Sequence, residues 1–83
     1  MNNKIYVAVI DVDECMGCAR SALEATEYGV YNSCTDYITE LNQRFSIDPK
    51  SVSMYSLTDF MDEYNNETLN VDGTFMGYVR ITT

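Results

Sequence analysis

The pair Cys15 and Cys18 is the strongest chemical signal in the sequence. Two thiolates separated by two residues in a tight loop can hold one metal ion, with each sulfur about 2.3 Å from a bound zinc. Gly17, between them, gives the backbone the freedom that such a turn needs. The motif therefore predicts a structural zinc site built on Cys15 and Cys18.

The remaining ligands of such a site are less well defined. A structural zinc takes four ligands, and Cys34 is the only other thiol of the chain. Asp13 stands next to the loop and is the candidate carboxylate ligand. Cys34 also lies on an apolar stripe between Val30 and Ile38, where a free cysteine packs as a small hydrophobic residue. Metal ligation and simple packing both remain open for Cys34.

The same two cysteines also have a redox interpretation. A strand, a CxxC pair and a possible helix resemble the start of glutaredoxins and thioredoxins. That resemblance implies that Cys15 attacks and Cys18 resolves, with a helix N-terminus lowering the pKa of the first thiol. The family also places a cis-proline before a later strand, and Pro49 precedes the apolar and polar alternation of residues 51–55.

The composition argues against catalysis and against binding to nucleic acid. Because the chain has no histidine, it cannot form a Ser-His-Asp triad, a Cys-His dyad or a His-based zinc enzyme. Thirteen acidic residues against five basic ones give a net charge of −8, which disfavours contact with phosphates and with anionic membranes. An acidic domain can instead bind a basic protein surface. The alternative is that the charge only keeps the protein soluble.

A run of acidic residues marks the candidate partner-binding surface. No basic residue occurs between Lys50 and Arg80. The apolar residues of 57–64 recur at helical spacing, which leaves the acidic ones on or near the solvent side. We expect them to dock on a groove lined by lysine and arginine, of the kind that normally holds nucleic acid. An ordinary solvated helix face is the alternative. The predicted partner-binding residues are Asp59, Asp62, Glu63 and Glu67.

The hydrophobic patterns predict a single domain over residues 1–83, of the α+β class. We expect a sheet of three or four strands, mainly antiparallel, with one long and one short helix packed on one face. Residues 5–12 are nearly continuous in apolar character, as in a central strand covered on both faces. Residues 51–55 and 75–82 are predicted as two further strands.

Apolar spacing predicts a long helix with a stripe from Val30 to Phe45, and Thr26 is its expected N-cap. A short helix over 57–64 follows Ser56, which forms a capping box with Asp59. Residues 19–26 fit either a short strand or a helix, because alternation coexists there with good helix formers.

Neither a membrane segment nor a secretory signal is expected. The apolar run of residues 5–10 is too short to span a membrane, and acidic rather than small residues follow it. Three cysteines, an odd number, fit a disulfide framework poorly. We therefore expect a cytoplasmic, reducing location, which is the host cell cytoplasm if a phage encodes the chain.

In size, charge and α+β layout the whole chain resembles the small acidic proteins that phages use against host defences, anti-CRISPR inhibitors in particular. The resemblance implies a non-enzymatic inhibitor that binds a CRISPR effector nuclease and prevents guide or target DNA from loading. It transfers no residue-level site, so the predicted sites depend on the acidic run and the cysteine loop. Two alternatives stay open: a glutaredoxin-like CxxC oxidoreductase, and a small structural protein without a dedicated site.

Overall fold

The computed structural model describes residues 3–11, 16–27, 29–69 and 74–82. Within these ranges, four strands form one mixed sheet in the order β2-β4-β1-β3. The central strands pair antiparallel with each other, and β3 also pairs antiparallel with β1. The short β2 pairs parallel with the end of β4. The strands are β1 (Asn3–Asp11), β2 (Val30–Tyr31), β3 (Val52–Ser56) and β4 (Thr74–Thr82).

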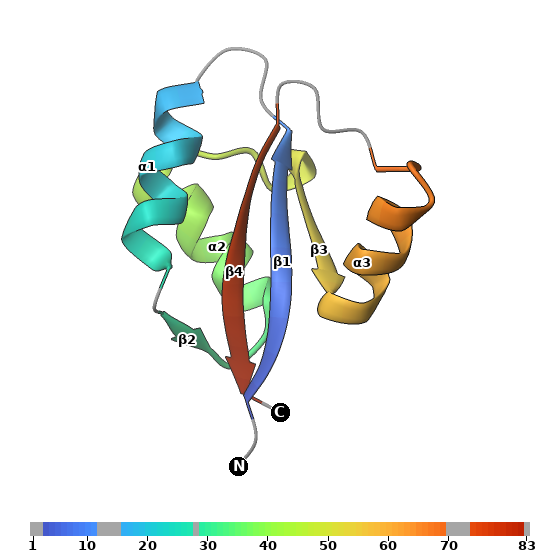
Figure 1. Cartoon of the computed structure of the whole chain (residues 1–83). Coiled ribbons are helices and arrows are strands. Elements are labelled where there is room, and N and C mark those ends of the chain that lie inside the picture. Colours follow the sequence, from blue (N-terminus) through green and yellow to red (C-terminus); the bar gives the residue numbers. More distant parts are fainter. Residues whose placement is uncertain (1–2, 12–15, 28, 70–73, 83) are drawn as a thin grey trace.

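Helices lie on both faces of this sheet. The helices α1 (Met16–Thr26) and α2 (Cys34–Phe45) pack on one face, and α3 (Leu57–Asn65) packs against β3 and β1. A short 3-10 helix over Pro49–Ser51 leads into β3. Figure 1 shows α2 behind β4 and β1, with α3 beside β3. The α+β class is confirmed, but the expectation of two helices on one face is wrong, since a third α-helix exists and α3 covers the opposite face.

The two faces of β1 explain its unbroken apolar sequence. Ala8 and Ile10 belong to the core that includes Ala22 of α1 and Leu41 of α2. Val7, which points the other way, lies against α3 residues. Every residue from 7 to 10 is buried, so the prediction of a central strand covered on both faces is confirmed for these residues, whereas Ile5 near the start of β1 is exposed.

The long helix is shorter than its apolar stripe indicates. Val30 is part of β2, where it pairs with Arg80, and α2 begins only at Cys34. Ser33 is the N-cap, and its Oγ accepts a hydrogen bond of 3.1 Å from the backbone N–H of Asp36. Thr26 is therefore not an N-cap but the buried last residue of α1. Strand pairing with β4 overrides the helical spacing at Val30.

The other local predictions agree with the structure. Residues 19–26 are helical, which resolves that ambiguity. The Ser56 side chain caps α3 by accepting a 3.2 Å hydrogen bond from the N–H of Asp59. The long helix ends at Ser46, which has a left-handed φ of 58° and whose N–H donates to the Asn42 carbonyl. None of the helices in the described ranges has the length and apolar character that crossing a membrane requires.

Candidate protein-binding surface

The face of the sheet that carries α3 is only partly covered. The helix packs on β3 and β1, and no helix crosses in front of β4 in Figure 1. Strand pairing places Val30, Arg80 and Ile5 in one row across β2, β4 and β1. Paired residues share a face of the sheet, and every second residue along a strand lies on the same face. Tyr78 and Met76 therefore lie on the same face as Arg80, next to α3. We call this surface the open face; it consists of Ile5, Val30, Tyr64, Met76 and Tyr78.

The open face collects most of the exposed apolar surface. Among the residues with described side chains, seven large hydrophobic ones are exposed, and five of them form the open face. Tyr78 is 61 % exposed and Tyr64 58 %. The other two, Leu57 and Met61, are on α3. Scattered exposed hydrophobic residues need no explanation, but a contiguous patch is typical of a protein interaction site.

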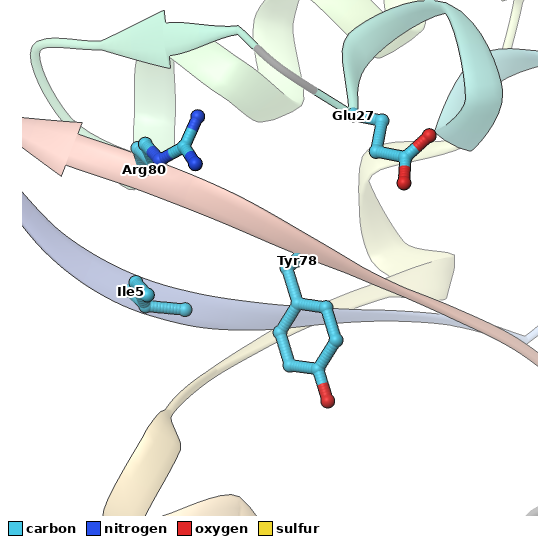
Figure 2. Close-up of a pocket in the computed structure, with 4 residues that line it drawn as sticks. All are labelled: Ile5, Glu27, Tyr78 and Arg80. Atoms are coloured by element: carbon cyan, nitrogen blue, oxygen red, sulfur yellow. The ribbon is translucent and has the colours of Figure 1, made fainter.

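Tyr78 separates two hollows of the open face. One, of about 220 Å³, lies between Ile5, Tyr78, Arg80 and Glu27 at the end of α1. Figure 2 shows these four side chains around β1 and β4. The second, of about 270 Å³, lies between Tyr78 and the side chains of α3. A tyrosine between two hollows offers the large, partly polar contact area that is enriched at interface hot spots.

An aromatic row fixes the border between the open face and α3. The Phe60 ring meets Tyr55 of β3 edge-on, with 6.5 Å between ring centroids. Tyr64 stacks on the other side of Phe60 at 6.3 Å. Such pairs contribute about 0.5–1.5 kcal/mol each beyond the burial of their area. The row therefore places the exposed Tyr64 ring beside the sheet, where it lines a hollow with Tyr78.

The predicted acidic surface is present on α3 and the turn that follows it. Asp59, Asp62 and Glu67 are exposed and Glu63 is half-buried. None of the four forms an ion pair within the described part of the chain, where the ion pairs lie within α1 and within α2. The helix also lacks a basic residue in its last turn. The acids are not part of the hollows, because Phe60 and Tyr64 are the α3 residues that line them. The result is an uncompensated negative helix beside an apolar face.

No family model, curated protein or solved structure matches the chain.

The two described cysteines, Cys18 and Cys34, lie at opposite ends of the helical layer. Cys18 lies in the first turn of α1, where it lines a hollow with Phe45 at the end of α2. Cys34 begins α2, and the 12 residues of that helix are about 18 Å long. The structure therefore does not bring Cys34 to Cys18. The predicted ligands Asp13 and Cys15 lie outside the described residues.

The chemistry of the two described cysteines differs. Cys18 is disulfide-bonded, whereas Cys34 is a free, half-buried thiol that packs against the core. Burial raises the pKa of the Cys34 thiol, which favours its protonated, less reactive form. Over the described ranges no three potential ligands gather in a group that could hold a metal. Because zinc binds the thiolate and not a disulfide sulfur, zinc ligation stays a prediction for the reduced chain.

One feature of the redox interpretation, a helix that starts at the CxxC motif, lies within the described residues. The helix α1 begins at Met16, inside the motif, and follows directly on the segment after β1. Cys18, the predicted resolving cysteine, thus lies in the first turn of this helix, whereas Cys15, the predicted attacking thiol, lies outside the described residues. The resemblance fails at Pro49, since no described peptide bond is cis.

Sequence reasoning did not find the open face. Residues 75–82 are apolar at nearly every position, so the pattern alone does not say which side stays uncovered. The signal that could have found it is Arg80, whose charge marks the solvent side and so assigns Tyr78 and Met76 to that side by alternation.

Proposed function

We propose that this protein is a non-enzymatic module that binds a basic protein surface. The observation that carries the proposal is the position of an uncompensated acidic helix beside an exposed apolar, tyrosine-rich face. Interfaces commonly combine aromatic anchors, which supply the binding energy, with charges that steer the partner and set orientation. The residues of α3 would supply the charge, and the open face would supply the anchors.

The partner class that fits best is a nucleic-acid-handling defence enzyme, and specifically a CRISPR effector nuclease. Such enzymes bind guide and target strands in positively charged channels, and an acidic helix can occupy a channel built for phosphates. The net charge of −8 on 83 residues supports this choice. The protein would then act as a phage-type inhibitor in the host cytoplasm, by preventing DNA or guide from loading.

The test is inhibition of DNA cleavage by purified CRISPR effector nucleases of each type. We expect the intact protein to inhibit at least one of them, and to bind it without binding DNA or RNA alone. Asp62→Lys should raise the half-inhibitory concentration about tenfold, since it reverses a charge in the desolvated contact. Asp36→Lys is the matched control, because Asp36 is an exposed acid of α2 outside the α3 surface.

Inhibition should also weaken as salt is raised, because screening reduces attraction between surface charges. An absence of inhibition across all effector types would contradict the inhibitor proposal. If Asp62→Lys and Asp36→Lys weaken inhibition equally, α3 is not part of the binding surface.

A thiol-disulfide oxidoreductase is the second candidate, and the observation that favours it is the disulfide-bonded Cys18 in the first turn of α1. In this reaction the attacking thiolate opens a substrate disulfide, and the second cysteine resolves the mixed disulfide. Reduction of insulin by dithiothreitol in the presence of the protein measures the activity. Cys15→Ser should abolish it and Cys34→Ser should not. If the unaltered protein does not accelerate the reduction, this candidate is rejected.

A further inference from the structure

The hollow between Tyr78 and α3, which we call the α3 hollow, is aromatic and has no charge among its described lining residues. Its volume of about 270 Å³ lies just below the range of about 300–1,000 Å³ for small-molecule sites, so it admits a single side chain. Three of its lining residues are aromatic, and they come from two different elements, α3 and β4. The described residues that line the hollow are Val7, Phe60, Tyr64, Met76, Gly77 and Tyr78.

The three rings of the α3 hollow favour a cation. Phe60 and Tyr64 lie nearly parallel, with 23° between the ring planes, and form the wall on the side of α3. Tyr78 lines the hollow from β4, and its ring extends away from the side chains of Glu27 and Arg80 (Figure 2). The face of an aromatic ring is negative and attracts a guanidinium or ammonium group within about 6 Å of the ring centroid.

The acidic helix adds a second attraction for a cation. Tyr64 lies in the last turn of α3, at the helix end that carries a partial negative charge, and this turn has no basic residue. Asp62, Glu63 and Glu67 lie within three residues of Tyr64 along the chain, and none of them is ion-paired within the described ranges. A helix with its side chains is about 10–12 Å across. The carboxylates therefore act on the hollow over roughly the screening length of about 8 Å in physiological salt.

The other hollow of the open face does not offer this attraction. It contains one charge of each sign, from Glu27 and Arg80, so a cation gains little there. Aromatic lining and unbalanced negative charge coincide only at the α3 hollow among the hollows of the open face.

Arginine is the cationic side chain that fits such a site best. Its guanidinium is planar and weakly hydrated and stacks on aromatic rings, whereas the lysine ammonium is compact and strongly hydrated. Arginine is also enriched among the residues that dominate interface energies. An apolar side chain could fill the hollow, but it would gain nothing from the charge of α3.

We propose that the α3 hollow receives the side chain of one arginine of the basic partner, with its guanidinium against the rings of Tyr64 and Tyr78. This inference rests on the proposed function, because it names the group by which the partner is held. The acids of α3 then draw the partner in, and the hollow selects the residue that anchors it.

A titration of the full chain with short basic peptides, followed by nuclear magnetic resonance, tests the inference. The probes are Lys-Lys-Arg-Lys-Lys and Lys-Lys-Lys-Lys-Lys, both capped, which carry the same charge and differ only in the central side chain. We expect the arginine peptide to shift the resonances of Tyr64, Met76 and Tyr78 saturably. The lysine peptide should bind at least about fivefold more weakly.

Variants of the hollow locate the binding. Tyr78→Leu and Tyr64→Leu should each raise the dissociation constant of the arginine peptide at least about fivefold and change that of the lysine peptide little, since only the aromatic ring is lost. Tyr78→Phe should keep the constant within about twofold, because the ring remains. Ile5→Ala is the matched control, because Ile5 is an open-face residue that lines only the other hollow. Far-ultraviolet circular dichroism confirms that each variant is folded.

Equal affinities for the two peptides overturn the inference, and so does an arginine peptide that shifts no resonance of the hollow. Tighter binding of a peptide with a central trimethyllysine would replace arginine as the occupant. The proposed function fails separately, because its test is inhibition and the effect of Asp62→Lys on it. Arginine-selective binding without inhibition would reject the inhibitor and leave the arginine site, whereas inhibition that Tyr78→Leu leaves unchanged would do the reverse.

Discussion

Leu23 of α1 lies so close to Gly77 of β4 that a side chain at position 77 fits only if the leucine moves. A Cβ atom at Gly77 would be 2.9 Å from Cδ2 of Leu23. Gly77 is central to the sheet, where it pairs with the fully buried Ala8 of β1. The Leu23 side chain of α1 therefore packs directly on the backbone of β4 at Gly77. This contact sets the distance between α1 and the sheet.

The first prediction concerns the size of the residue at position 77. Gly77→Val should lower the free energy of unfolding by about 1–3 kcal/mol, the usual cost of overpacking. Gly77→Ala should change it far less, since the atom that must move is the end of a flexible leucine. Gly17→Ala is the control, because nothing lies within 4 Å of its Cβ position. Urea unfolding of the four proteins measures the differences. Equal losses for alanine and valine would contradict the contact.

The second prediction concerns the buried hydroxyl pair of Thr26 and Tyr37. The two hydroxyl oxygens are 3.2 Å apart, and Thr26 Oγ1 also donates to the Ala22 carbonyl at 2.8 Å. Thr26→Val should cost about 1–3 kcal/mol, because it leaves the Tyr37 hydroxyl buried without a partner. Tyr37→Phe should cost about 0.5–1.5 kcal/mol, since Thr26 keeps its bond to Ala22. Thermal unfolding that ranks the two variants in the opposite order would contradict this account.

Thr26 also shows where sequence reasoning reaches its limit. A threonine before an apolar stripe is a common N-cap, and local pattern alone cannot show that it ends one helix instead of starting the next. The same holds for Val30, whose helical spacing is real but whose partner is Arg80, fifty residues away. Local signals sufficed where the interaction is local, as in the Ser56 cap of α3.

The features of the candidate site also differ in whether local sequence patterns could predict them. The acids of α3 could be predicted because an amphipathic helix places its charged side toward solvent by itself. The open face could not be predicted from the sequence, because it depends on the packing of α3, which covers β3 and β1 but not β4. The separation of Cys34 from Cys18 likewise depends on the direction in which α2 runs, which spacing does not reveal.

The third prediction is a loss of stability at alkaline pH. Burial, followed by the nearby Glu40 carboxylate, raises the pKa of Tyr31 well above its ordinary 10.0. Burial likewise raises the pKa of Tyr37. A raised pKa means that the folded state holds the phenol proton more tightly than the unfolded chain does. This contribution is complete below pH 10 and is lost as the pH rises further.

Unfolding free energies measured on either side of pH 10 check this dependence. Tyr31→Phe should flatten the alkaline decline, because phenylalanine does not titrate. Glu40→Gln should flatten it partly, since the neighbouring negative charge is removed. A decline of the same slope in all three proteins would show that other groups cause it.

The fourth prediction connects the cap of α3 with partner binding. Ser56→Ala removes the acceptor for the Asp59 N–H and should cost about 1 kcal/mol. The first turn of α3 would fray, so binding of a basic partner should weaken although no charge has changed. Ser33→Ala, which removes the equivalent cap of α2, should lower stability by a similar amount and leave binding intact. Binding lost equally in both variants would point to general destabilisation.

The fifth prediction concerns zinc and the oxidation state of Cys18. Because the Cys18 sulfur is disulfide-bonded, the oxidised chain should bind no zinc. Reduction frees a thiolate in the first turn of α1, and the reduced chain, prepared without chelator, should then bind one zinc ion. Native mass spectrometry with elemental analysis gives the stoichiometry. Cys18→Ser should abolish binding, whereas Cys34→Ser should not, since Cys34 lies at the far end of α2. If the reduced chain binds no zinc, the metal site is excluded, and disulfide formation is then the remaining chemical role of the CxxC motif.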